Sequence, residues 1–307
     1  MKKLKTGILG LDSLLDGGFN EHSATILVGS SGTGKTTMAL QFLRKGLETG
    51  NEGIYITLEE SKEQILAEAK SMGWEDIESY IEQGSLVFLE AAGKDLADFI
   101  KEELPQFVED WEGSNARIVI DPLTPVIWAF EDKYDQRMLI SQLFKETKRV
   151  GTVLSTIEEH GNAGEMASGM AGGETVIPMY LADTIVRIYF AGLGSMGNRM
   201  LNIIKSRQSW HSDLSYPYRF VLGIGIVIDT SEMEPKRIKK LTPEMKLQIN
   251  ERVASLPKRD AEQIKTIVRY MERADLGDMA PERIIDMLIE DYQNSAQGTM
   301  EGTVGPM

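Results

Sequence analysis

The sequence predicts an α/β protein: a mostly parallel, twisted sheet built around a glycine-rich loop, followed by a small helical module. Three observations lead to this fold class. Short apolar runs alternate with segments of helical periodicity through the first half of the chain, which is typical of parallel strands joined by helices. A glycine-rich motif stands between the first long apolar run and the first long helix. Beyond residue 231 the pattern is helical alone.

The expected elements follow one another in a regular order. Strands are predicted at 23–29, 53–58, 85–90, 117–121 and 152–156, and helices at 35–49, 61–72, 95–111 and 134–149. Pro105 should kink or split the third helix because it lacks a backbone N–H and clashes with the preceding turn. Strands at 183–190, 200–206 and 220–228 are joined by glycine-rich or polar turns. We expect these to be antiparallel additions to the same sheet.

These patterns divide the chain into three parts. Residues 1–231 form the α/β domain, and residues 232–294 form the helical module. The module is predicted because three apolar stripes recur at helical spacing. Their members are Met245, Ile249, Val253 and Leu256; Ile264, Ile267, Val268 and Met271; and Ile284, Ile285, Leu288 and Tyr292. Residues 295–307 carry no periodic pattern, and we expect them to be disordered.

The composition excludes several classes of protein. The absence of cysteine excludes disulfides, thiolate zinc sites and a cysteine nucleophile, and it fits a cytoplasmic protein. No apolar run reaches the roughly 18 residues that a membrane-spanning helix needs, so no membrane association is expected. The chain has 33 Lys and Arg against 47 Asp and Glu, a net charge of −14. Nucleic-acid binders usually carry a basic surface, so we expect no nucleic-acid partner.

The glycine-rich motif matches the phosphate-binding pattern G-x-x-x-x-G-K-[ST] at every fixed position. Its residues are Gly29, Ser30, Ser31, Gly32, Thr33, Gly34, Lys35 and Thr36, and Thr37 follows. Glycines let backbone N–H groups turn toward phosphates, and the helix that starts here directs its positive end at the anion. We expect Lys35 to contact the β- and γ-phosphates and the Thr36 hydroxyl to bind Mg²⁺. ATP and Mg²⁺ are therefore the expected ligands.

An acidic residue at the end of a later strand completes the expected metal site. The run RIVID at 117–121 ends in Asp121, which we expect to support the Mg²⁺ shell. A turn-forming Asp before Pro122 is the structural alternative. Ser155 and Thr156 end the next strand, where hydroxyls either sense a γ-phosphate or bond locally to the backbone.

Two adjacent carboxylates, Glu59 and Glu60, stand at the end of the strand IYITL. A solvated strand end explains them without any function. The alternative is that one of them activates a water molecule, because in-line hydrolysis of a phosphate needs a carboxylate within hydrogen-bond reach of the attacking water. Neighbours on a strand point in opposite directions unless the strand has ended. The sequence leaves open which of the two is the base.

Further segments occur together with these motifs in a fixed order. They are TGILGLD at 6–12, LLDGGF at 14–19, TTMALQFL at 36–43, YITLEES at 55–61, NRML at 198–201, IKSR at 204–207 and WH at 210–211. In this combination the chain resembles the KaiC-like branch of the RecA-superfamily P-loop ATPases, in a single-domain form. The resemblance covers residues 1 to about 230. It implies a RecA-like P-loop NTPase core.

The resemblance also implies roles for individual residues. In this family the paired glutamates lie near the γ-phosphate, which assigns Glu59, Glu60 and Lys35 to the catalytic site. Subunits form rings, usually hexameric, with nucleotide between them, and a neighbour supplies cations to the γ-phosphate. Lys205 and Arg207 match those positions, and alternation along a strand would place both on one face. A solvated strand face is the alternative for these two residues.

Two departures from relatives narrow the function. The clock protein of the family phosphorylates a Ser-Thr pair, but the matching positions are Met179 and Tyr180, so autophosphorylation is disfavoured, although Thr175 or Thr184 could substitute. A loop that binds single-stranded DNA needs cationic and aromatic side chains. No Lys or Arg lies between Gly151 and Val186, so DNA binding through a loop in this segment is not expected.

The leading hypothesis is an oligomeric, ATP-hydrolysing regulatory protein with a further protein partner. A DNA-repair motor, a slow ATP-bound scaffold and an auto-kinase are the alternatives.

Overall fold

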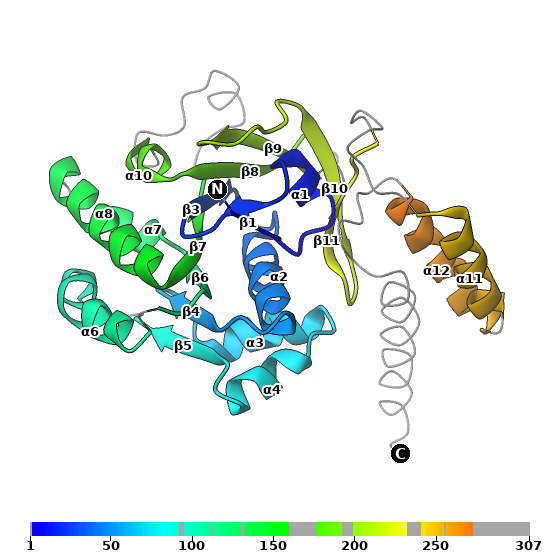
Figure 1. Cartoon of the computed structure of the whole chain (residues 1–307), viewed down its shortest axis with the longest axis horizontal. Helices are drawn as coiled ribbons and strands as arrows, with labels where there is room; N and C mark the ends of the chain where they lie inside the picture. The colour runs from blue at the N-terminus through cyan, green and yellow to red at the C-terminus, as the bar shows by residue number, and fades with distance from the viewer. Residues whose placement is uncertain are drawn as a thin grey trace, which may run out of the picture.

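The computed structural model describes residues 2–91, 95–111, 113–129, 132–159, 176–191, 199–231, 241–254 and 256–272 (Figure 1). Three features that the sequence singled out lie outside these ranges. They are residues 160–175 of the stretch that lacks Lys and Arg, the third apolar stripe at 284–292 and the tail at 295–307.

The domain is organised around one nine-stranded sheet with the order β11-β10-β9-β8-β3-β7-β6-β4-β5. Six neighbouring strands, from β8 to β5, pair in parallel, and β9, β10 and β11 are added antiparallel at one side. The strands are β3 (Ala24–Gly29), β4 (Gly53–Thr57), β5 (Leu86–Glu90), β6 (Ala116–Asp121), β7 (Gly151–Glu158), β8 (Thr184–Phe190), β9 (Arg199–Ser206), β10 (Ser215–Val221) and β11 (Gly225–Ile228). The predicted mostly parallel α/β fold with antiparallel additions is confirmed.

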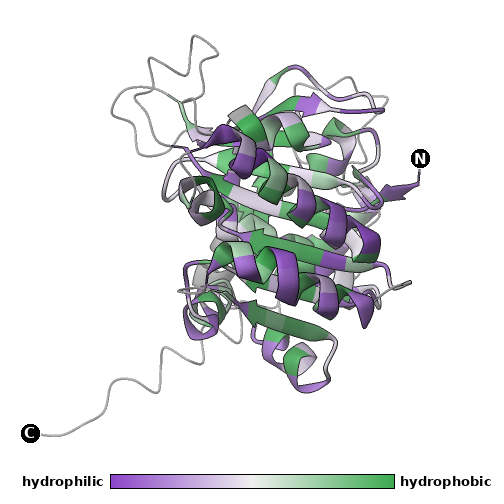
Figure 2. Cartoon of the chain, turned by 90° about the vertical axis from the view of Figure 1, so that its left-hand side faces the viewer, coloured by the Kyte–Doolittle hydropathy of each residue, from purple (hydrophilic) through white to green (hydrophobic). Residues whose placement is uncertain are grey.

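Helices cover both faces of the sheet and bury two separate cores. One core lies under α2 (Lys35–Glu48), α3 (Lys62–Ser71) and α4 (Asp76–Glu82). The other lies under α5 (Leu96–Asp98), α6 (Leu104–Glu109), α7 (Thr124–Trp128), α8 (Lys133–Val150) and α10 (Val176–Leu181). Figure 2 shows the apolar strands enclosed between helices whose outer faces are hydrophilic. A small sheet of β1 (Lys3–Leu4) and β2 (Phe19–Asn20) and the short helix α1 (Leu11–Leu14) precede the large one.

Two predicted elements are divided in the structure. The strand expected at 220–228 is wrong: β10 ends at Val221 and β11 begins at Gly225. Gly223 and Gly225 have φ values of 77° and 99°, which allow a tight hairpin turn. The helix expected at 95–111 is split, with a π-helical turn at Phe99–Glu103 and Pro105 in the first turn of α6. Proline fits a helix start because its missing N–H would have no partner there.

Two helices follow the sheet and pack on its outer end. They are α11 (Pro243–Ala254) and α12 (Lys258–Met271), beside β10 and β11 in Figure 1. Their buried side chains form a third apolar cluster with Leu9, Val221 and Val227. The first two of the three predicted stripes therefore face a common core, and they pack against the hairpin. Among the described residues, no helix is long and apolar enough to cross a membrane.

One buried amide joins the hairpin to the P-loop helix. Gln41 on α2 donates from Nε2 to the carbonyls of Gly7 and Ile226, at 3.0 and 3.2 Å, and its Oε1 accepts from the Ile226 N–H at 2.8 Å. The side chain is 5% exposed. Its removal would leave buried backbone groups without partners, and each such group costs stability.

We therefore expect Gln41→Leu to lower the free energy of unfolding by about 2–5 kcal/mol, since up to three buried hydrogen bonds lose one partner. Denaturant unfolding measures the change. Gln83→Leu is the matched control, because Gln83 ends α4 at the surface and should change stability by less than about 0.5 kcal/mol. Equal stability of the two variants would contradict this role for Gln41.

Candidate nucleotide-binding site

The candidate site is a cavity of about 430 Å³ at the carboxyl ends of β3, β4 and β6. Ligands of open α/β sheets commonly bind at this edge. The lining residues are Ser31, Gly32, Gly34, Lys35, Thr36, Thr37, Glu59, Glu60, Glu68, Asp121, Pro122, Glu158, Arg199 and Phe220. The structure therefore brings the glycine-rich motif, the glutamate pair and the strand-terminal Asp into one cavity.

The glycine-rich loop is closed on itself and begins the helix behind it. The Thr33 hydroxyl and the Lys35 ammonium both donate to the Ser30 carbonyl, at 2.7 and 3.1 Å. Gly34 caps α2 with φ 100°, a left-handed conformation that favours glycine. Burial lowers the pKa of Lys35, and the nearby carboxylates of Glu158, Asp121 and Glu159 oppose this shift. The ammonium thus faces the acidic side of the cavity.

The antiparallel strand β10 holds the other side of the loop. The Tyr218 hydroxyl donates to the Thr33 carbonyl at 2.6 Å. A Cβ placed on Gly34 would lie 2.4 Å from Cζ of Phe220, so the ring of Phe220 packs directly on the loop backbone. Burial raises the pKa of Tyr218, so the hydroxyl remains a hydrogen-bond donor at neutral pH. The additions to the sheet therefore shape the cavity.

Asp121 is the acidic centre of the cavity, and it is 5% exposed. Its carboxylate accepts from the Tyr55 hydroxyl at 2.6 Å and from the Thr156 hydroxyl. Tyr55 lies on β4 and Thr156 on β7, the two strands that flank β6. The Thr156 hydroxyl therefore does not make the local backbone bond that was one of its two expected roles, because it donates to a carboxylate 35 residues away in the chain. Ser155 is buried, and its hydroxyl has no hydrogen-bond partner among the residues that the structure describes.

Glu59 and Glu60 lie beyond the last residue of β4, Thr57. Helix α3 starts right after the pair with a capping box between Ser61 and Gln64. Because the strand has ended, the two carboxylates need not point to opposite faces, and both line the cavity. Burial raises the pKa of Glu60, and the Asp121, Glu68 and Glu59 carboxylates add to this effect.

Four residues of the cavity wall are not among the site residues that the sequence predicted. Glu68, Glu158 and Phe220 come from three separate elements, and no spacing along the chain connects them with the motif. Arg199 drew notice only within the late hairpin. Its guanidinium lies 4.9 Å from the centre of the Phe220 ring. Such residues are found only when the topology is known, because β9 and β10 reach the loop from far along the chain.

The side chains of Lys205 and Arg207 both donate to backbone carbonyls near the end of α10. Neither residue lines the cavity of its own chain. The Lys205 ammonium donates to the Ala182 carbonyl at 2.6 Å and to the Met179 carbonyl at 3.1 Å. Arg207 donates to the Tyr180 carbonyl at 3.0 Å. The two cations thus sit together at the carboxyl end of α10, where positive charge is favoured.

Comparison with known proteins gives consistent matches. The family model described as "ATPase: KaiC" matches residues 4–233. The circadian clock oscillator protein KaiC of Thermostichus vulcanus is 30% identical over 240 residues, 74% of this chain and 44% of that protein. A UPF0273 protein of Pyrococcus horikoshii is 30% identical over 244 residues, 74% of this chain and 94% of that protein. The chain spans less than half the length of the clock relative.

A solved structure has the same architecture. The crystal structure of a KaiC-like protein from Pyrococcus horikoshii OT3 matches with a TM-score of 0.62 and 28% identity, covering 74% of this chain and 98% of that one. The fold and the cavity together define a RecA-like α/β nucleotide-binding protein. Within that class, the chain belongs to the KaiC ATPase family, whose model matches nearly the whole α/β domain.

Gly34 offers a direct test of the cavity. In Gly34→Ala the new Cβ would press on Phe220 and would hold a strained φ, so we expect Mg·ATP to bind at least about tenfold more weakly, a loss of 1.4 kcal/mol or more. Calorimetric titration measures the affinity. Gly50→Ala is the matched control: its φ is 82°, nothing lies within 4 Å of its Cβ, and it is remote from the cavity. It should lose only about 1–2 kcal/mol of stability. Wild-type affinity in Gly34→Ala would refute the assignment.

Proposed function

We propose that the chain hydrolyses ATP to ADP and phosphate at the cavity around the P-loop, in complex with Mg²⁺. The observation that carries this proposal is the convergence of Lys35, Glu59, Glu60 and Asp121 on a single cavity. Phosphoryl transfer requires positioned phosphates, a cation and an oriented nucleophile. The cavity offers a residue of the right type for each of these requirements.

The phosphates of the nucleotide belong on the glycine-rich loop. Gly29 is packed so tightly that a Cβ would lie 2.4 Å from the Ile188 carbonyl, whereas a Cβ on Gly32 would meet nothing within 4 Å. The loop is therefore fixed at its base and open toward the cavity. In the proposal, backbone N–H groups from residues 30–37 surround the phosphates. Lys35 then exchanges its bond to Ser30 for bonds to the β- and γ-phosphates.

The residues also fit a Mg²⁺ ion. The Thr36 hydroxyl lines the cavity and would be a direct ligand. Both oxygens of Asp121 already accept a hydroxyl, so their remaining lone pairs suit water molecules of the ion's shell. When bound, Mg²⁺ neutralises phosphate charge. Glu59, Glu60, Glu68 and Glu158 make the wall acidic, so ATP without a cation would be repelled.

The glutamate pair is assigned to the attacking water. A carboxylate at Glu59 or Glu60 would accept a hydrogen bond from the water and would orient it in line with the γ-phosphate. The neighbouring residue would orient that carboxylate or contact an adjoining subunit. Autophosphorylation has no such support, because the positions that match the clock protein's Ser-Thr pair are Met179 and Tyr180.

The active unit in the proposal is a closed ring of identical subunits, hexameric in its most common form, with a regulatory role toward a protein partner. Lys205 and Arg207 lie together at the surface end of α10 and away from their own cavity. In a head-to-tail ring these two cationic side chains can reach the γ-phosphate of the ATP that is bound to the neighbouring subunit. Residues 160–175 lie outside the described ranges, so the absence of a nucleic-acid partner stays a prediction.

Substitution of each glutamate tests hydrolysis. We expect Glu59→Gln or Glu60→Gln, whichever replaces the base, to lower turnover by about 10²–10⁴-fold while Mg·ATP still binds. The other substitution should have a smaller effect. Phosphate release and calorimetric titration give the two quantities. Glu63→Gln on the exposed side of α3 is the control. Full turnover in both variants would contradict the assignment of the pair.

A further inference from the structure

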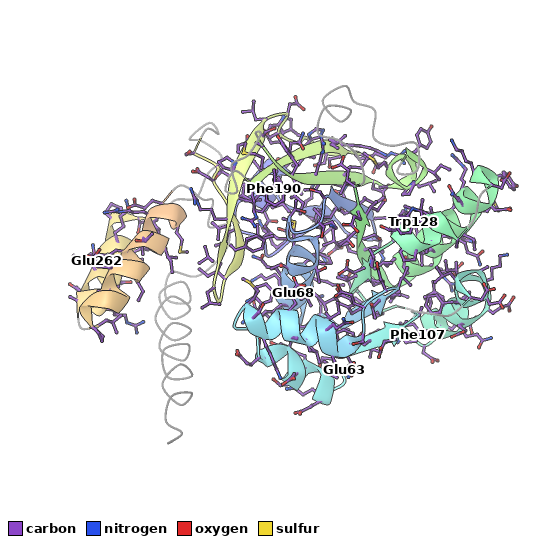
Figure 3. All side chains as sticks on the ribbon, turned by 180° about the vertical axis from the view of Figure 1, so that it is seen from behind. Glu63, Glu68, Phe107, Trp128, Phe190 and Glu262 are labelled. Atoms are coloured by element: carbon purple, nitrogen blue, oxygen red, sulfur yellow. The ribbon has the colours of Figure 1, made fainter. Side chains whose placement is uncertain are left out.

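Glu68 is a charged residue on the buried side of a helix. On α3 the side chains of Ile65 and Ala69 are buried. Glu68 follows Ile65 by three residues, which places it on the same side of the helix. It faces α2 in Figure 3, whereas Glu63 lies on the outer side of the same helix. Glu68 is half-buried and lines the cavity. A carboxylate at such a position costs free energy unless it makes a specific interaction.

That interaction is with the P-loop helix. The Thr37 hydroxyl donates to Oε1 of Glu68 at 2.6 Å. Within the described ranges Glu68 has no ion pair with a Lys or Arg. Burial and the Asp121 charge raise the pKa of Glu68, and the bond from Thr37 opposes the shift. The environment therefore does not favour a carboxylate for stability alone, which suggests a functional reason for it.

The Thr37–Glu68 hydrogen bond connects the two parts of the proposed catalytic site, which are the P-loop with α2 and the glutamate pair with α3. Thr37 follows Thr36 in the first turn of α2. Glu68 lies on the helix that starts directly after Glu59 and Glu60, and the capping box at Ser61 attaches the pair firmly to that helix. The position of the glutamates relative to the loop thus depends on how α3 is held against α2. The Thr37–Glu68 bond fixes this contact at the edge of the cavity.

We propose that Glu68 is a positioning residue: through Thr37 it holds α3, and with it Glu59 and Glu60, at the distance from the P-loop that hydrolysis requires. This inference rests on the proposed function, because the pair is taken to be catalytic. It assigns Glu68 no contact with the nucleotide. What matters is the acceptor oxygen that Glu68 presents to Thr37, and not its charge.

Two readouts test this role, one of which does not depend on turnover. Hydrogen exchange of the backbone amides at residues 58–62 reports how firmly the pair is held, and phosphate release reports kcat. In Glu68→Ala we expect faster exchange in this segment and a kcat lower by about tenfold, since small misplacements of reacting groups are costly. The Kd for Mg·ATP should stay within about threefold, a difference of less than 1 kcal/mol.

Three further variants separate the effect of the Thr37–Glu68 hydrogen bond from the effect of the negative charge of Glu68 and from nonspecific effects of a substitution. Glu68→Gln keeps an oxygen that can accept from Thr37, so it should restore slow exchange and most of kcat. Thr37→Val removes the donor, so it should loosen residues 58–62 as Glu68→Ala does. Glu82→Ala removes an exposed carboxylate from the end of the neighbouring helix α4 and should change neither readout.

The outcomes distinguish this inference from the proposed function. If Glu68→Ala leaves exchange at residues 58–62 unchanged, or if Glu68→Gln is as damaged as Glu68→Ala, the positioning role is overturned. If the wild-type chain shows no hydrolysis, the proposed function fails, and the exchange data alone still decide whether Glu68 holds the segment. Slow exchange in Glu68→Gln together with fast exchange in Glu68→Ala and Thr37→Val supports the inference.

Discussion

The carboxylate of Asp121 is the constraint on which the site depends. It accepts hydrogen bonds from Tyr55 and from Thr156, and these bonds connect three adjacent strands at the edge of the sheet where the cavity opens. Hydrogen bonds to a charged group contribute about 1.5–3 kcal/mol each. A charge that is 5% exposed needs such partners. Burial raises the pKa values of Tyr55 and Glu60, and the Asp121 carboxylate adds to both shifts, so it influences both the scaffold and the glutamate pair.

The cavity is completed by strands from the end of the domain. On β10, Tyr218 hydrogen-bonds to the glycine-rich loop and Phe220 packs on it. Gln41 on α2 forms hydrogen bonds with the backbone of β11. On the far side of this hairpin, Val221 and Val227 belong to the apolar cluster of α11 and α12. One hairpin therefore contacts the phosphate loop on one side and the helical module on the other. The module lies beyond the family match at residues 4–233, so its packing on the hairpin is a feature that the family model does not describe.

The parts of the site that are predictable from the sequence are those that a local pattern encodes. The loop at 29–36 is recognisable because its chemistry needs fixed residue types at fixed spacing. Asp121 is recognisable because a buried β run ends in an acid. Glu68, Arg199 and Phe220 are not, because their place in the cavity depends on strand order and on helix packing. The hairpin turn at Gly223 was not predicted, because the apolar residues on both sides of it form a pattern typical of one continuous strand.

The proposal joins the cavity of one subunit to Arg207 of its neighbour in a single ATP site, and mixing two inactive variants tests it most directly. Lys35→Ala lacks a working P-loop but carries Arg207, and Arg207→Ala has the opposite defect. In an equal mixture, turnover should recover to about a quarter of the wild-type value, because a head-to-tail ring places an intact loop beside an intact Arg207 in that share of sites. If each folded variant is inactive alone and the mixture stays inactive, completion in trans is contradicted.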